Sequence, residues 1–231
     1  MDVPCSLYGG YMNIEIRNIQ KSFGKKEVLR DVSFSCTGGK IVGILGGNGS
    51  GKSTLFGVLT GLIRADAGAF TIDGFPVVGK RRREMVGLVP QKPPLFEELT
   101  AKDNLLLWYD REQMERELDG GILNMLGIDA FLKVPVSKMS GGMKKRLAIG
   151  CAVAHRPPIL LLDEPCAALD LICKERIANY LIEYRNEGHC VLLATHDVNE
   201  ISLCDELYIL KDGTVTPFEY DGNIHKLVGR L

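Results

Sequence analysis

The chain has 231 residues, of which 45% are hydrophobic and 25% are charged, the ordinary mix of a globular protein. Its 28 Lys and Arg residues nearly balance 29 Asp and Glu residues, which argues against a protein that binds nucleic acid mainly by charge. The longest apolar runs, such as residues 147–154, fall short of the roughly 18 to 20 residues that a membrane-spanning helix needs, and no signal segment is evident. We therefore expect a chain that does not cross a membrane by itself.

Seven cysteines are present, an odd number without any Cys-x-x-Cys pair. Most lie in apolar surroundings, which favours reduced thiols in a cytosolic compartment over a disulfide framework or a zinc site. We expect packing roles for them, with Cys166 alone close to the acidic pair at residues 163 and 164.

The first elements predicted along the chain are two strands. Residues 1–12 are interpreted as an N-terminal extension because they show no periodic pattern. From Met12 to Ile19, apolar and polar residues alternate, which predicts a half-buried strand. A second strand is predicted from Val28 to Ser35, after a turn around residues 24–26. Both are expected in a sheet with one solvated face.

Three later segments, residues 41–45, 159–162 and 191–194, are almost entirely apolar. Such runs suit strands that are buried on both faces of a parallel sheet, and each is followed by glycines or polar residues at the edge where open α/β sheets bind ligands. Between about 92 and 150 the pattern becomes helical, with Thr100 as a candidate N-cap for a helix over 101–110 and apolar spacing that favours a helix over 112–126. The sequence therefore predicts a three-layer α/β core interrupted by a helical subdomain.

Residues 46–54 read Gly-Gly-Asn-Gly-Ser-Gly-Lys-Ser-Thr and fit the pattern Gly-x-x-x-x-Gly-Lys-Ser/Thr. The glycines let backbone N–H groups converge on one anion, and the helix beginning near Gly51 adds its positive end. Lys52 would supply a charge for the β- and γ-phosphates, and Ser53 a hydroxyl for Mg²⁺. A glycine-rich turn that only connects a strand to a helix is the alternative. The pattern predicts a nucleoside triphosphate site that contains Gly46, Asn48, Gly49, Gly51, Lys52, Ser53 and Thr54.

Asp163 and Glu164 follow the apolar run at 159–162. Successive side chains of an extended chain point in opposite directions, so the two carboxylates can take separate roles. Asp163 is a candidate Mg²⁺ ligand, and Glu164 is a candidate base or water-orienting group beside the γ-phosphate. Without a cation the two carboxylates would repel each other, which disfavours a purely structural role.

The tripeptide Ser140-Gly141-Gly142 precedes a predicted helix over 143–154 and stands 23 residues before Asp163. Together with the phosphate loop and the acidic pair, it resembles the signature motif of the ATP-binding cassette (ABC) ATPases, usually Leu-Ser-Gly-Gly-Gln. The resemblance implies that these residues complete the ATP site of a partner subunit, whereas Ser140 taken alone could be a helix N-cap. Two positions depart from the usual motif, since Met139 replaces Leu and Met143 replaces Gln, and the second change removes an amide.

Three further residues match the family pattern, and a fourth position departs from it. Gln91 resembles the Q-loop glutamine, which approaches Mg²⁺ and the attacking water. Asp170 resembles the D-loop aspartate, and His196 resembles the switch histidine that contacts the γ-phosphate. Phe23 stands where the family often has a Tyr that stacks on adenine, and a Phe ring keeps the face for stacking. The resemblance thus implies catalytic roles for Glu164, His196 and Gln91, and Mg²⁺ ligation by Ser53, Gln91 and Asp163.

The resemblance implies an α/β fold: a P-loop NTPase (RecA-like) core with an antiparallel β subdomain and an inserted helical subdomain. It implies one domain over residues 13–231, with the core at 13–91 and 151–217 and the helical subdomain at 92–150, after the extension at 1–12. The implied function is an ATP-binding and ATP-hydrolysing subunit that powers an ABC membrane transporter through nucleotide-driven dimer closure. It would bind ATP and Mg²⁺ and pair with a second cassette, either an identical chain or a paralogue. Transmembrane permease subunits would hold it at the cytoplasmic face of the membrane.

A soluble, non-transport ABC ATPase that acts on a nucleic-acid or ribosomal complex is the alternative function. Such relatives usually carry two cassettes or long coiled-coil insertions, whereas Gln91 and Ser140 are only 49 residues apart. The basic clusters at 80–83 and 144–146 lack interleaved aromatic residues, so we interpret both as solvated surface and expect no nucleic-acid partner. A switch that binds ATP but barely hydrolyses it is disfavoured, because Glu164 and His196 are both present.

Overall fold

The computed structural model describes residues 11–167 and 169–230, so most of the expected N-terminal extension, including Cys5, lies outside the described residues. Within those two ranges, ten strands form one sheet in the order β5-β4-β1-β2-β10-β9-β3-β8-β7-β6. The strands are β1 (Asn13–Phe23), β2 (Lys26–Thr37), β3 (Lys40–Leu45), β4 (Ala67–Ile72), β5 (Phe75–Pro76), β6 (Val86–Val89), β7 (Ile159–Asp163), β8 (Cys190–Ala194), β9 (Glu206–Lys211) and β10 (Thr214–Pro217).

The two strands predicted near the N-terminus are confirmed and are longer than predicted. β1 and β2 pair antiparallel, and β4 joins the other edge of β1, also antiparallel. Residues Ile14 and Ile16 of β1 are almost fully buried, while Asn13 and Arg17 are exposed. This alternation leaves one face of the antiparallel part solvated, as the sequence predicts.

The three apolar runs form the centre of the parallel part, β9-β3-β8-β7-β6. Every residue of β7 and β8 is buried, because successive side chains enter two different cores. Leu160 and Leu162 pack into the core beneath the helical subdomain, whereas Leu161 packs with Phe56 on the opposite face. Burial on both faces explains why these strands show no polar alternation.

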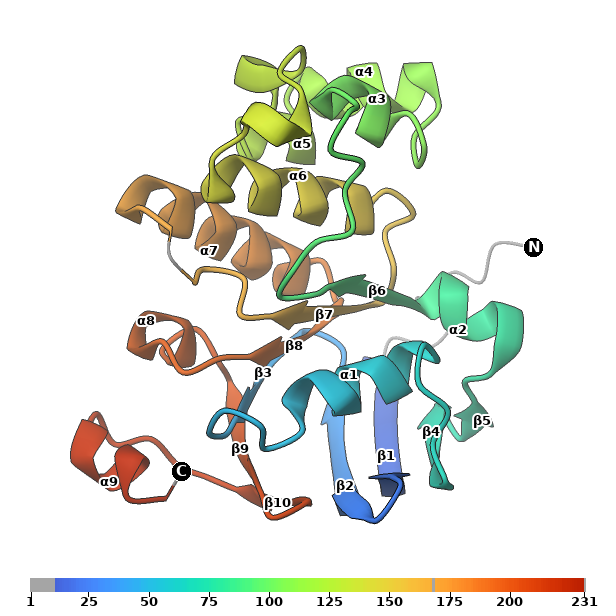
Figure 1. The fold of residues 1–231 in the computed structure, drawn as a ribbon, viewed down its shortest axis with the longest axis vertical. Helices are drawn as coiled ribbons and strands as arrows, with labels where there is room; N and C mark the ends of the chain where they lie inside the picture. Colours follow the sequence, from blue (N-terminus) through green and yellow to red (C-terminus); the bar gives the residue numbers. More distant parts are fainter. Residues whose placement is uncertain (1–10, 168, 231) are drawn as a thin grey trace.

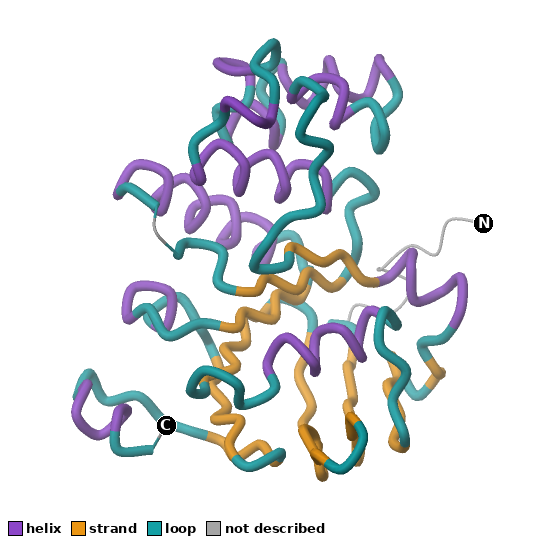
Figure 2. Tube along the Cα trace, in the orientation of Figure 1, coloured by secondary structure: helices purple, strands orange, loops and turns teal. Residues whose placement is uncertain are grey.

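Helices cover both faces of the parallel part. α1 lies on one side of it, while α6 and α7 lie on the other side, with α3, α4 and α5 stacked beyond α6 (Figures 1 and 2). The helices are α1 (Lys52–Thr60), α2 (Gly79–Met85), α3 (Ala101–Leu105), α4 (Arg111–Leu118), α5 (Ile122–Met125), α6 (Gly141–Ala152), α7 (Leu171–Asn186), α8 (Val198–Ile201) and α9 (Ile224–Val228). Two short 3-10 helices cover Asp129–Phe131 and Val136–Lys138. Within the described part of the chain, no helix combines the length and apolar character needed to cross a bilayer.

The helical region is more broken than the sequence predicts. Thr100 is the N-cap of α3, as predicted, but α3 ends at Leu105 instead of continuing to residue 110. Asp110 is extended and accepts a hydrogen bond from the Gln113 backbone N–H (2.7 Å), so it begins α4 and cannot also continue α3. The helix predicted over 112–126 is two helices, α4 and α5, because Gly120 adopts the left-handed region (φ 105°) between them.

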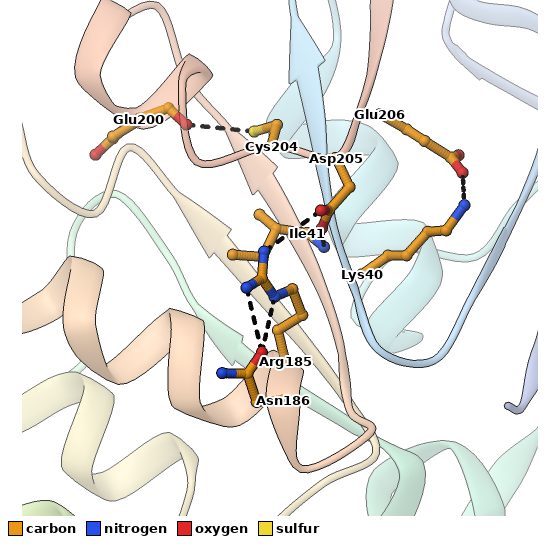
Figure 3. A network of polar contacts seen from close by, with 8 residues as sticks. All are labelled: Lys40, Ile41, Arg185, Asn186, Glu200, Cys204, Asp205 and Glu206. Atoms are coloured by element: carbon orange, nitrogen blue, oxygen red, sulfur yellow. Dashed lines mark hydrogen bonds and ion pairs between the residues drawn. The ribbon is translucent and has the colours of Figure 1, made fainter.

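A polar network anchors the amino end of β3 (Figure 3). Asp205, just before β9, accepts hydrogen bonds from the Ile41 backbone N–H (2.8 Å) and from Nη1 of Arg185 in the last turn of α7 (3.3 Å). Lys40 forms an ion pair with Glu206 beside it. These contacts fix β3 and α7 to β9 at the edge opposite to the phosphate loop, which leaves the carboxyl end of β3 free to present that loop.

Candidate functional site

The predicted site residues of the core lie at one edge of the parallel sheet. Gly46 follows β3, Gln91 lies two residues after β6, Asp163 ends β7, and His196 lies two residues after β8. Because these strands are parallel, their carboxyl ends meet at the same edge, which is where open α/β sheets bind ligands.

The phosphate loop depends on glycine at two kinds of position. A Cβ added at Gly46 would lie 2.6 Å from the Leu210 carbonyl oxygen, so no larger residue fits there. Gly49 and Gly51 have φ angles of 79° and 109°, which residues with a side chain rarely adopt. Lys52, only 7% exposed, donates hydrogen bonds from Nζ to the carbonyl oxygens of Gly46 (2.7 Å) and Gly47 (3.1 Å). Burial lowers the pKa of Lys52, against the opposing effect of the carboxylates of Glu164 and Asp163.

Two oxygen atoms that can act as metal ligands lie close together beside this loop. The Ser53 hydroxyl on the first turn of α1 donates a hydrogen bond to Oδ2 of Asp163 (2.6 Å). Asp163 is 5% exposed, so its carboxylate lies at the bottom of the cleft and not at the surface. A hydroxyl and a carboxylate at this spacing are the ligand types that Mg²⁺ prefers.

Glu164 lies between Gln91 and His196. Nε2 of Gln91 donates a hydrogen bond to Oε2 of Glu164 (2.9 Å), and Nδ1 of His196 lies 3.4 Å from Oε1. The backbone of Glu164 is left-handed (φ 49°), and its N–H donates to the Ala194 carbonyl oxygen (2.9 Å). This turn separates Glu164 from Asp163 and gives the two carboxylates different neighbours.

Gln91 and Glu164 line a cleft of about 560 Å³, whereas His196 and Gly46 are beside it without being part of its lining. The predicted residues that contribute to its wall are Phe23, Asn48, Gly49, Gly51, Lys52, Ser53, Thr54, Gln91, Asp163 and Glu164. Lys26 and Val28, which sequence reasoning did not identify, line it as well, because the β1–β2 hairpin folds over the phosphate loop. The Phe23 ring, 51% exposed, is available at the rim for stacking on a planar group.

Four predicted residues at the first turns of α6 and α7 lie outside that cleft lining. Ser140 is the exposed N-cap of α6 and accepts a hydrogen bond from the Met143 N–H (3.2 Å), and Gly141 beside it is also exposed. Asp170 is the exposed N-cap of α7. A Cβ added at Gly142 would lie 3.2 Å from the Cys173 sulfur, so the first turns of α6 and α7 are in close contact. Within one chain, the structure therefore separates the predicted residues of the phosphate loop and strand ends from those at the first turns of α6 and α7.

The interpretation of residues 144–146 as solvated surface is wrong for two of the three. Lys145 is 6% exposed and faces the strand ends near the cleft. Arg146 donates from Nη1 to the Leu126 carbonyl oxygen (2.8 Å) and stacks over Phe131. Lys145 could have been found from the helical spacing of 142, 145 and 149, which places it on the same buried face as Gly142 and Ile149.

The cysteines within the described residues are free thiols, and all but half-buried Cys204 are buried. Cys166, the one near Glu164, has its backbone N–H bonded to Oε1 of Glu200 (2.9 Å). Burial raises the pKa of its thiol, so Cys166 stays protonated and acts in packing.

Comparison with known proteins identifies the family. The family model described as ABC transporter matches residues 29–167. The lantibiotic transport ATP-binding protein SrtF of Streptococcus pyogenes is 31% identical over 91% of this chain and 92% of that protein. The linearmycin resistance ATP-binding protein LnrL of Bacillus subtilis is 34% identical over 87% of this chain and 67% of its own length. For the Nod factor export ATP-binding protein I of Sinorhizobium fredii, the identity is 38% over 87% of this chain and only 60% of that protein.

Solved structures agree with this assignment. The ATP-binding subunit of an ABC transporter superposes with a TM-score of 0.81 at 28% identity and covers 94% of both chains. A dimeric ATP-binding cassette in a post-hydrolysis state, bound to ADP and Pi, superposes with a TM-score of 0.79 at 30% identity over 89% of this chain and 98% of the other. The P-loop NTPase fold predicted from the sequence is thereby confirmed, and the chain belongs to the ABC transporter family as an ATP-binding and ATP-hydrolysing cassette.

Proposed function

We propose that this cassette powers export through a transporter whose membrane subunits are separate chains, and that it works at the cytoplasmic face of the membrane. The similar proteins support this direction of transport, since one is named for Nod factor export and another for linearmycin resistance. The observation that carries the mechanism is the separation of two residue groups in one chain. Lys52 and Glu164 share a cleft, whereas Ser140 lies at an exposed helix end outside its lining.

We assign Mg²⁺ to Ser53, Asp163 and Gln91. The Ser53 hydroxyl and the Asp163 carboxylate already converge at 2.6 Å, and both are hard oxygen donors. Gln91 lines the same cleft and uses its amide nitrogen to bind Glu164, so its amide oxygen can be offered to the metal while that bond is kept. When bound, Mg²⁺ supplies positive charge to the β- and γ-phosphates and so favours departure of ADP.

Each residue of the cleft would then have its own role in the hydrolysis of ATP. Lys52 binds the β- and γ-phosphate oxygens, and the backbone N–H groups of the loop hold the rest of the triphosphate. Glu164 accepts a proton from the water that attacks the γ-phosphorus, while the bond to the ADP oxygen breaks. Gln91 and His196, one at each carboxylate oxygen, keep Glu164 oriented toward that water.

The second part of each ATP site would come from a second copy of this chain. Ser140 and the main-chain N–H groups at the N-terminus of α6 form a donor group, which suits the γ-phosphate held by the partner. Asp170, exposed on the adjacent first turn of α7, would meet the same partner. Because one chain carries both halves of the site, two copies related by a two-fold axis make two complete sites. ATP favours the closed pair because only that state gives the γ-phosphate both sets of donors.

The permease subunit would occupy an apolar groove of about 440 Å³ between α1, β6 and the helical subdomain. Four exposed apolar side chains lie along it: Leu62, Phe96, Leu107 and Trp108. A patch of this kind, partly rimmed by Arg83 and His155, is typical of a protein contact and suits a short amphipathic helix from a permease loop. Gln91 lines the ATP cleft, while Pro90 directly before it and Pro94 to Phe96 after it line this groove, so the two sites are adjacent along the chain.

The decisive experiment uses Glu164→Gln, which keeps the shape of the side chain and removes its charge. Hydrolysis should fall by about 10²–10⁴-fold, the usual contribution of a general base. Long-lived ATP should then hold the closed pair, so size-exclusion chromatography with light scattering should detect a dimer in ATP and Mg²⁺ but not in ADP. Glu175→Gln, on the exposed side of α7, is the matched control and should behave as the parent chain. A parental rate would contradict the role of Glu164, and a slow variant that stays monomeric would contradict the identical pair.

A further inference from the structure

Lys145 is a buried cation in the helix that follows the signature tripeptide. It lies in the second turn of α6 and is 6% exposed, although lysine is rarely buried to this extent. Its ammonium group faces main-chain carbonyl oxygens and not the carboxylate of an ion pair: Nζ lies 3.4 Å from the oxygens of both Pro90 and Gln91, and 3.5 Å from that of Asp163.

These three oxygens belong to two neighbouring strand ends. β6 and β7 are paired in parallel up to Val89 and Leu162, and beyond this point the chains diverge. Gln91 then enters the segment toward the permease groove, while the left-handed turn at Glu164 leads toward α7. The Lys145 ammonium group is a hydrogen-bond partner for both strand ends: its contact with the Asp163 carbonyl oxygen is buried, and those with Pro90 and Gln91 are part-buried.

The two neighbouring basic residues have different partners. Lys144 forms an ion pair with Glu97 (2.8 Å), on the outer side of the helical subdomain. Arg146 donates to the Leu126 carbonyl oxygen, which belongs to the same subdomain. Of these three consecutive residues, only Lys145 joins α6 to the strand ends that carry Gln91 and Asp163.

We propose that Lys145 is a positioning residue that couples the two ATP sites of the dimer, an inference that rests on the proposed role of Ser140 toward the partner's ATP. Ser140 and Lys145 lie on one short helix, about 7 Å apart along its axis at the usual rise per residue. When the partner's γ-phosphate engages the N-terminus of α6, the shift of that rigid helix moves Lys145, and with it the main chain at Gln91 and Asp163. Since Gln91 is bonded to Glu164, the shift reaches the catalytic carboxylate of the same chain.

The test compares Lys145→Met and Lys145→Gln with Lys133→Met, a control on the exposed surface of the same subdomain. Methionine keeps the length of the side chain and removes its donors, whereas glutamine keeps a neutral donor. In Lys145→Met without nucleotide, amide hydrogen exchange in segments 89–92 and 162–165 should rise by about tenfold, because the strand ends open more easily once their carbonyl oxygens lose the Lys145 partner. With ATP, kcat should fall by about tenfold with KM within about twofold, and the Hill coefficient should fall toward one. Lys145→Gln should recover part of both effects.

The exchange measurement needs no dimer, so it separates this inference from the proposed function. Parental exchange in both segments would overturn the coupling and leave the roles of Glu164 and Ser140 untouched. Faster exchange with a parental kcat and Hill coefficient would also overturn it, since Lys145 would then act only in stability. If Lys145→Met does not fold, Lys145→Gln carries the same comparison, and a parental Hill coefficient in that variant overturns the inference.

Discussion

At the scale of single residues, Lys52 shows how the site exchanges internal contacts for ligand contacts. Its Nζ is bonded to two loop carbonyl oxygens, and burial lowers its pKa. A triphosphate would replace these neutral partners with anionic oxygens, and a charge-assisted bond contributes about 1.5–3 kcal/mol. The loop thus holds a desolvated cation in the place where phosphate charge would compensate it.

We therefore expect Lys52→Ala to weaken ATP binding by about 10- to 100-fold, as one charge-assisted bond implies. Isothermal titration calorimetry would measure the affinity, and a melting curve without ATP would show whether loss of the two carbonyl contacts also unfolds the loop. Lys102→Ala, at an exposed position of α3, is the matched control and should bind ATP like the parent chain. An affinity for Lys52→Ala within about twofold of the parent would contradict the phosphate role of this loop.

At the scale of elements, α6 has an exposed N-terminus at Ser140 and a buried face that contains Lys145. These two parts of the helix can therefore be tested separately. Ser140→Arg places a bulky cation at the exposed N-terminus, where it would block the partner's phosphate without touching the cleft of its own chain. ATP binding to the monomer should stay within about twofold, while steady-state turnover should fall by at least about tenfold. Joint loss of ATP binding and folding would show that Ser140 is only a helix cap, in which case Ser140→Ala should show the same loss in milder form.

The sequence predicts the elements best where local residues decide the structure. The phosphate loop and the strands buried on both faces are evident because a short pattern fixes each of them. The helix ends at Leu105 and Leu118 were missed because a competing cap at Asp110 and the left-handed Gly120 decide them, and apolar spacing contains neither. Lys145 was misinterpreted because a run of basic residues suggests surface, whereas its burial depends on two strand ends more than fifty residues before it and almost twenty after it. Likewise, the approach of Lys26 and Val28 to the phosphate loop is a tertiary contact that no local pattern encodes.

At the scale of the whole molecule, the ATP cleft and the apolar groove are connected by one continuous segment. Gln91 lines the cleft, and the chain from Pro94 to Phe96 lines the groove. Asn104 fixes the far end of this segment, because it accepts from the Phe96 N–H (2.9 Å) and donates to the Phe96 carbonyl oxygen (3.2 Å). A rigid end at Phe96 means that movement of Gln91 on hydrolysis would be passed to whatever occupies the groove, instead of being absorbed by a loose loop.

This connection predicts that Leu107→Asp separates the cassette from its transporter. Leu107 is 54% exposed along the groove, so the free chain tolerates a carboxylate there, whereas a docked permease helix would bury that charge without a partner. In cells that carry the transporter, the fraction of cassette retained on washed membranes should fall by at least about tenfold. Val228→Asp, at an exposed position of α9 away from the groove, should be retained like the parent chain. If Leu107→Asp is retained like the parent chain and melts at the same temperature as the control, the permease contact lies on another surface. The segment from Gln91 to Phe96 would then have no partner to move.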